Sequence, residues 1–165
     1  MQFITFRLGD SLPQNKLLEI KEVVEEWKRN HAVELTPEEY DEYCNLYDFK
    51  FEEYLNNGFG ECLLRYKPIQ DIVELAIRHY DGVRYDLFDF IIMPNHVHLL
   101  IIPGAEFLPE QIINSIKSYS SRQINKLLGR NGRIWQKESF DRMIRSYGDY
   151  ENKKEYIKHN GDHLI

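Results

Sequence analysis

The stretch that decides the fold is YDLFDFIIMPNHVHLLIIP, at residues 85–103. It contains two apolar runs, 85–93 and 96–103, separated by a Pro-Asn pair. Such runs with a short turn between them predict two adjacent antiparallel strands. Because side chains alternate along a strand, His96 and His98 are expected on the same face, about 7 Å apart. Two imidazoles in an otherwise apolar strand therefore need an explanation.

The chain on either side of this pair predicts further strands and helices. The opening FITFRL is β-rich, and prolines followed by apolar residues at helical spacing mark several helix starts. The remaining elements are expected as a strand at 3–8, helices opening at Pro13, Pro37 and Pro68, a helix over 109–128, a short strand at 140–145 and a last helix over 149–160 that Gly161 stops.

An acidic stretch interrupts this order. Residues 34–53 hold eight acidic residues and one lysine, and Thr36 with Glu39 predicts a capping box at a helix start. We interpret residues 30–60 as a helical insertion within a single domain spanning 1–165. Without it the order is strand, helix, strand, strand, helix, strand, helix. That order predicts an α+β fold, with an antiparallel sheet and helices mainly on one face.

Composition excludes several protein classes. No apolar run reaches the ~20 residues that cross a bilayer, and the N-terminus lacks the layout of a signal peptide. The two cysteines, Cys44 and Cys62, cannot form a disulfide framework and match no zinc spacing. We expect reduced thiols in a cytoplasmic protein with no membrane partner.

Charge is distributed unevenly along the sequence. The net charge is −6, but residues 1–90 carry a balance of −9 and residues 91–165 one of +3. Within 117–145, eight basic residues face two acidic ones. A local positive field can steer a polyanion despite an acidic total, although such a run can also be a solvated surface.

The histidine pair allows two interpretations. Two imidazoles on one strand face can chelate a divalent cation, or they can be hydrogen-bonded or exposed histidines without a metal. Histidine-triad nucleotide hydrolases would need a third histidine at position 100, where the sequence has Leu100. A metal-dependent hydrolase of small phosphoesters is therefore the weakest candidate.

The last helix supplies groups that could complete a metal site. Tyr156 and Asn160 are four residues apart and share one helix face. An amide oxygen suits a hard cation such as Mg²⁺ or Mn²⁺, and a tyrosine beside a cation can be a nucleophile. A core aromatic and a helix-end asparagine are the alternative. His159 is a candidate base by proximity only, and the competing tyrosines are Tyr119, Tyr147 and Tyr150.

Three segments resemble a known family. IIMPNHVHLLI, IWQKESFDRMIR at 134–145 and EYIKHN at 155–160 resemble the HUH-type single-tyrosine transposases, and within these the REP-associated tyrosine transposases. The opening FITFRLGDSLP is similar to the first strand of that subgroup. The resemblance implies a palm-like antiparallel sheet related to the ferredoxin and RNA-recognition folds.

The resemblance also implies an activity and its residues. His96, His98 and Asn160 become ligands of Mg²⁺ or Mn²⁺, and Tyr156 becomes the nucleophile. The implied reaction is metal-dependent cleavage of single-stranded DNA, followed by strand transfer through a 5′-phosphotyrosine intermediate. The partner is single-stranded or hairpin DNA, and we expect a homodimer because each chain supplies one tyrosine.

Basic residues in the C-terminal half are expected to hold the DNA. Trp135 could stack on a base or anchor the core. The expected DNA contacts are Lys117, Arg122, Lys126, Arg133, Trp135, Arg142, Arg145, Lys153, Lys154 and Lys158.

Two departures from the family leave a second function open. The family continues after the helix asparagine with a proline, where this sequence has Gly161, and it often carries an arm before the first strand. The alternative to an active enzyme is a catalytically retired, transposase-derived module that binds DNA or RNA without cutting it.

Overall fold

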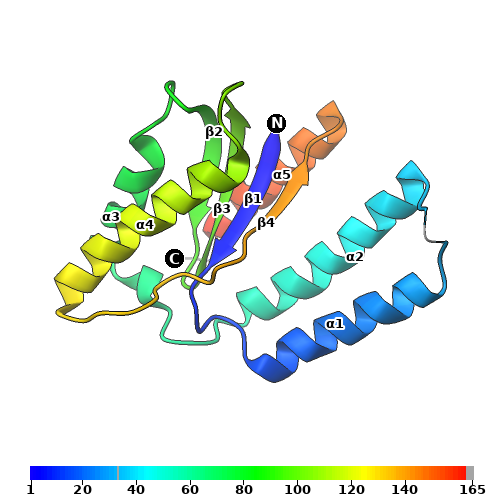
Figure 1. The fold of residues 1–165 in the computed structure, drawn as a ribbon, viewed down its shortest axis with the longest axis horizontal. Coiled ribbons are helices and arrows are strands. Elements are labelled where there is room, and N and C mark those ends of the chain that lie inside the picture. The colour runs from blue at the N-terminus through cyan, green and yellow to red at the C-terminus, as the bar shows by residue number, and fades with distance from the viewer. Residues whose placement is uncertain (33, 163–165) are drawn as a thin grey trace. The chain divides into compact units, whose positions relative to one another are not determined.

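The computed structural model describes residues 1–32 and 34–162 (Figure 1). Two compact units share the chain: Met1–Gly9 with Cys62–Ile165, and Asp10–Glu61. The elements in chain order are β1 (Gln2–Arg7), α1 (Gln14–Arg29), α2 (Pro37–Asn56), a short 3-10 helix η1 (Leu63–Arg65), α3 (Lys67–Arg78), β2 (Tyr85–Ile92), β3 (His96–Pro103), α4 (Pro109–Leu128), β4 (Phe140–Met143) and α5 (Tyr147–Asp162).

The first unit is built on a four-stranded sheet in the order β2-β3-β1-β4. Every neighbouring pair of strands is antiparallel. Within this unit the chain runs β1, α3, β2, β3, α4, β4 and then α5, which is the ferredoxin-like βαββαβ order with one added helix. The predicted α+β fold with an antiparallel sheet is confirmed, and so is the pairing of the two strands around Pro94.

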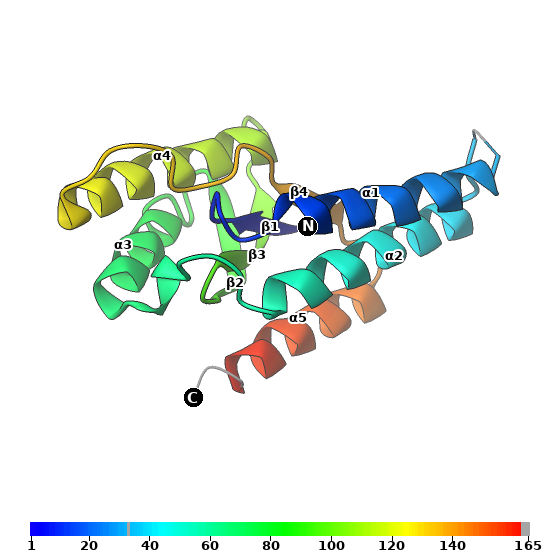
Figure 2. The same cartoon turned by 90° about the horizontal axis from the view of Figure 1, so that it is seen from below.

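The two faces of the sheet are covered by different helices. On one face α3 and α4 pack against the alternating residues Ile4, Phe6, Val97 and Leu99. On the other face Ile157 of α5 packs against Phe3 and Leu100. Figure 2 shows α3 and α4 on one side of the strands and α5, in orange to red, on the other. The histidines of β3 therefore lie on the face that α5 covers.

Proline and glycine set most helix boundaries as predicted. Pro109 occupies the first turn of α4, and Gly129 ends it with a positive φ of 61°. The bounds predicted for α5 were wrong: it begins at Tyr147 and runs through Gly161 to Asp162. The Ser146 hydroxyl accepts a bond from the Asp149 amide and starts the helix earlier than predicted.

The second unit is a pair of helices with its own apolar core. Leu12, Ile20 and Val24 pack with Phe51 and Leu55 along α1 and α2. The predicted capping box is confirmed at the start of α2: the Thr36 hydroxyl accepts from the Glu39 amide, and the Glu39 carboxylate accepts from the Thr36 amide. That residues 30–60 are an insertion in a single domain stays a prediction.

The ends of the second unit are tied together. The Asp10 carboxylate accepts a bond of 2.7 Å from the Glu61 amide, so the unit begins and ends at one place. Gly60 makes this closure possible: its φ is +87°, and a Cβ there would lie 2.7 Å from Asp10 atoms.

In the described part of the chain no helix has the length and apolar character needed to cross a membrane.

Candidate metal and nucleophile site

Register with β1 fixes the surroundings of the two histidines. Thr5 lies opposite His98 and Arg7 lies opposite His96, so all four side chains emerge on the same face of the sheet. Both histidines have an exposed fraction of 0%. Buried imidazoles need partners for both ring nitrogens, so their hydrogen bonds define the site.

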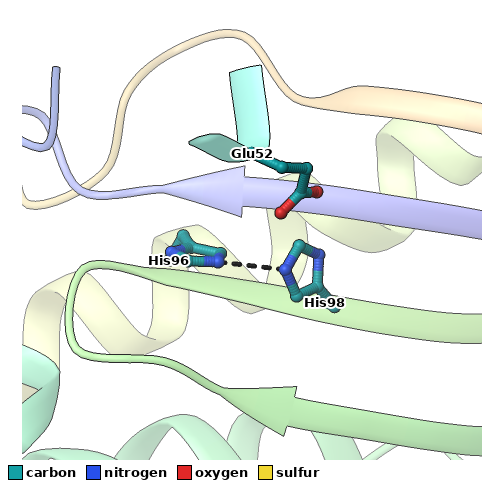
Figure 3. A group of neighbouring side chains, drawn as sticks. All are labelled: Glu52, His96 and His98. Carbon is teal, nitrogen blue, oxygen red and sulfur yellow. Dashed lines mark hydrogen bonds between the residues drawn. The ribbon is translucent and has the colours of Figure 1, made fainter. Parts of the chain in front are cut away.

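Each ring uses one nitrogen to contact the other ring and one to contact a neighbour. The two Nε2 atoms are 2.9 Å apart, as the dashed line in Figure 3 marks. His96 Nδ1 lies 2.7 Å from Asn95 Oδ1, and His98 Nδ1 lies 2.8 Å from Thr5 Oγ1. Glu52, also labelled in Figure 3, belongs to the unit of residues 10–61.

The separation of the Nε2 atoms suits a shared cation. Two ligand atoms at about 2.1 Å from one ion and at right angles are about 3 Å apart. The observed 2.9 Å matches this separation. Because both Nδ1 atoms are already engaged by the chain, both Nε2 atoms converge on one point. The pair is therefore a candidate metal site.

Tyr156 lies against this pair. Its ring meets the His98 ring edge to face, with 5.2 Å between centroids and 78° between planes. Phe3 contacts both rings: it stacks on His98 with 5.3 Å between ring centroids, and it lies edge to face with Tyr156 with 6.2 Å between centroids. The structure thus brings the tyrosine of the last helix to the imidazoles of β3.

Asn160 has an unusual amide. The residue is 9% exposed, and its Nδ2 has no hydrogen-bond partner within the described structure. A buried amide without a partner costs about 1–3 kcal/mol. One turn after Tyr156, this nitrogen is a donor that the described residues leave unmatched, whereas the amide oxygen is the atom that could ligate a cation.

The sequence model of the family described as "Transposase IS200 like" matches residues 62–160. This range is more than half of the chain, and it includes His96, His98, Tyr156 and Asn160. The chain belongs to the IS200-like transposase family. The family resemblance drawn from the sequence is confirmed.

Two solved structures are among those similar to this chain. One is a REP-associated tyrosine transposase bound to a REP hairpin, with 14% identity and a TM-score of 0.46. That match covers 94% of this chain but only 62% of the other. The second is a protein from Deinococcus radiodurans R1 assigned as a transposase, with 13% identity, a TM-score of 0.43, and 97% and 90% of the two chains covered. A search of the curated proteins found no match.

Two of the expected DNA contacts lie inside the fold. Trp135 is 3% exposed; its indole donates to Ser120 Oγ at 2.8 Å and its rings meet Phe6. It is a core anchor, the alternative that its sequence context left open. Lys117 is 7% exposed, and its ammonium donates to three backbone carbonyls, of Gln136, Lys137 and Glu138. All three of its donors are thus taken by the chain.

The other expected contacts divide between the two faces of the sheet. Arg122 and Lys126 are exposed on α4, the helix that packs on the face opposite the histidines. On the α5 side, the Lys153 ammonium lies 4.6 Å from the Phe3 ring centroid and 5.8 Å from that of Tyr156. Arg142 is 3.9 Å from Asp149. The remaining residues, Arg133, Arg145, Lys154 and Lys158, are exposed.

The competing groups are less well placed. Tyr119 lies on α4, on the opposite face, and Tyr147 is 77% exposed. Tyr150 packs in the cluster around Phe3 without a ring contact to either histidine among the described residues. His159 is exposed, and its Nδ1–H donates to the Glu155 carbonyl.

Sequence reasoning missed the residues that hold the histidines. Asn95 adjoins His96, so its position in the turn was a usable signal. Thr5 is 93 residues from His98, and only the β1–β3 register brings the two together. Phe3, which stacks on His98, was missed for the same reason.

Proposed function

We propose that this transposase-family protein cleaves single-stranded DNA and transfers strands through a covalent bond to Tyr156. One observation carries the proposal: the Tyr156 ring packs on the His98 imidazole, and the Nε2 atoms of His98 and His96 point toward each other. Family membership supports the class of reaction. The residues in these roles are His96, His98 and Asn160 for the metal and Tyr156 for the attack.

The residues fit a divalent cation. Two imidazole nitrogens would hold it, and the Asn160 carbonyl oxygen would be the third ligand from this unit, which suits Mg²⁺ or Mn²⁺. Once bound, such a cation polarises a phosphate oxygen and neutralises charge that develops during attack.

The chain's own part in the reaction is nucleophilic. The Tyr156 hydroxyl oxygen forms a bond to the phosphorus, and the bond from phosphorus to the 3′ oxygen breaks. The phenol gives up its proton, and the leaving oxygen takes one up as a 3′-hydroxyl. A 5′-phosphotyrosine results. Attack on this link by the 3′-hydroxyl of a second strand reverses the bond changes and releases Tyr156.

Cations around α5 would hold the cleaved strand. Lys153 lies beside the Tyr156 ring, and Lys154 and Lys158 are exposed on the same helix. Exposed Arg122 and Lys126, on the far face of the sheet, would bind phosphates remote from the scissile bond, as a hairpin stem would supply. Since strand transfer joins two cleaved ends and each chain offers one Tyr156, we propose a homodimer.

The test is trapping of the covalent adduct. The protein is incubated with end-labelled, hairpin-bearing single-stranded DNA and Mn²⁺ or Mg²⁺, and products are separated under denaturing conditions. A slow-migrating protein–DNA band is expected from the wild type and from Tyr150→Phe, the matched control on the same helix, but not from Tyr156→Phe.

Two results would contradict the proposal. An adduct that survives Tyr156→Phe would assign the attack to another residue. Tight DNA binding that EDTA leaves unchanged, without cleavage at any metal concentration, would instead identify a retired binding module.

A further inference from the structure

Four buried side chains form one line of hydrogen bonds. Asn95 Oδ1 contacts His96 Nδ1 at 2.7 Å, the two histidines meet through Nε2 at 2.9 Å, and His98 Nδ1 contacts Thr5 Oγ1 at 2.8 Å. None of these residues is more than 2% exposed. A donor or acceptor that lost its partner in this line would have no solvent to replace it.

Chemistry fixes the direction of the line in the metal-free protein. An amide oxygen only accepts, so His96 Nδ1 carries the proton that bonds to Asn95. A neutral imidazole has one N–H, which leaves His96 Nε2 bare. His98 must then donate from Nε2 across the 2.9 Å contact. Its own Nδ1 is bare and accepts from the Thr5 hydroxyl.

A cation needs both Nε2 lone pairs. His96 already offers one, whereas His98 carries its proton on Nε2 and must hold it on Nδ1 instead. The His98 Nδ1 changes from acceptor to donor, and a hydroxyl is a side-chain group that can match either role by rotating.

We propose that Thr5 and Asn95 are positioning residues that set which nitrogen of each histidine carries the proton. Asn95 keeps His96 permanently ready for a metal, and Thr5 lets His98 exchange one tautomer for the other without losing a partner. The inference rests on the proposed function only for the identity of the ligand, a divalent cation. The direction of the hydrogen-bond line rests on the three contacts and on the donor and acceptor chemistry of the groups that make them.

The first experiment reads the tautomers directly. Two-bond ¹H–¹⁵N spectra of ¹⁵N-histidine-labelled protein distinguish a proton on Nδ1 from one on Nε2. Without metal, we expect the proton on Nδ1 of His96 and on Nε2 of His98. With Zn²⁺ as a diamagnetic probe, the His98 proton should be on Nδ1. A His98 proton on Nδ1 in the metal-free protein would overturn the inference.

The second experiment measures Mn²⁺ affinity from the free-ion electron paramagnetic resonance signal. Thr5→Val keeps the shape of the side chain and removes the hydroxyl, and loss of such a partner weakens metal binding by about 10–100-fold. Thr5→Ser should restore wild-type affinity. Ser120→Ala is the matched control, because it removes another buried hydroxyl, bonded to Trp135, outside the line. Its Mn²⁺ affinity should stay unchanged.

The outcomes separate this inference from the proposed function. Wild-type Mn²⁺ affinity in folded Thr5→Val would overturn the role given to Thr5 while leaving the metal site standing. A wild type that binds no Mn²⁺ would overturn the metal site of the proposed function, and the metal-free tautomers would still decide the direction of the line.

Discussion

Lys117 provides a stability test whose sign can be worked out in advance. Its ammonium lies 3.0–3.1 Å from the carbonyl oxygens of Gln136, Lys137 and Glu138, on the segment that leads into β4. Burial lowers the pKa of Lys117 from 10.5 to about 8, an effect that the carboxylate of Glu138 opposes and the charge of Arg7 adds to.

Two opposing contributions determine the effect of Lys117→Met. Three hydrogen bonds from a charged donor contribute about 1.5 kcal/mol each at the lower end of their usual range, or about 4.5 kcal/mol together. Keeping the charge inside the fold costs about 3 kcal/mol at full strength, and about 2 kcal/mol after screening by nearby solvent. The hydrogen bonds are the larger contribution, so the Lys117→Met variant should be less stable than the wild type at pH 7 by about 2–3 kcal/mol.

The pH dependence follows from the direction of the pKa change. Between pH 8 and 10.5 the folded protein loses the Lys117 proton while the unfolded chain keeps it, so folding stability rises with pH. The Lys117→Met variant lacks this rise. The gap in unfolding free energy between the two proteins should therefore widen by about 2 kcal/mol from pH 7.5 to 10.

The assay is urea unfolding of both proteins at matched pH values, followed by circular dichroism. Other titrating groups contribute equally to both proteins and cancel in the difference. A gap that stays constant between pH 7.5 and 10 would refute the assigned pKa, and a variant more stable than the wild type at pH 7 would refute the hydrogen bonds as the dominant contribution.

Three further predictions concern Trp135, Asn160, and the pair Arg122 and Lys126. Trp135→Ala should lower the free energy of unfolding by about 3–5 kcal/mol in urea titrations. Folded Trp135→Phe should bind single-stranded DNA as the wild type does. A selective loss of DNA binding in that variant would show that Trp135 contacts DNA. Asn160→Leu removes a buried amide nitrogen without a partner, so calorimetry should show equal or higher stability and weaker Mn²⁺ binding; unchanged Mn²⁺ affinity would remove Asn160 from the site. Replacing Arg122 and Lys126 together by alanine should lower the salt dependence of hairpin binding, measured as log K against log salt, by about 1.4–1.8; an unchanged slope would exclude both from phosphate contact.

Much of the fold could be predicted from local signals in the sequence. The alternating and apolar runs on either side of Pro94 predicted β2 and β3. Pro109 and Gly129 predicted the two ends of α4, the long helix that follows β3. The start of α5 was harder to predict, since the Ser146 hydroxyl that begins the helix is one of many serines and threonines able to cap. Local signals in the sequence predict where helices and strands lie, but they do not show which serine caps a given helix.

The candidate site was predictable only in part. His96, His98, Tyr156 and Asn160 carry recognisable spacing, because alternation on a strand and a four-residue step on a helix are local rules. Thr5 is joined to His98 by strand register, which no local pattern in the sequence encodes.

Charge counts along the sequence do not show which basic side chains are buried or which face of the sheet they lie on. Counting charges in 117–145 could not show that the Lys117 ammonium is enclosed by three carbonyls. Nor could it show that Arg122 and Lys126 extend from a helix on the face opposite the histidines. Orientation relative to a sheet depends on tertiary packing, which charge counts do not carry.

The proposed function depends on the two imidazoles of β3 holding one cation beside the tyrosine of α5. Crystals soaked in Mn²⁺ and measured at an anomalous wavelength test it most directly. One manganese peak is expected about 2–2.3 Å from both Nε2 atoms of His96 and His98, on the side that Tyr156 faces. A saturated soak in which the two Nε2 atoms remain bonded to each other, with manganese elsewhere or absent, would contradict it.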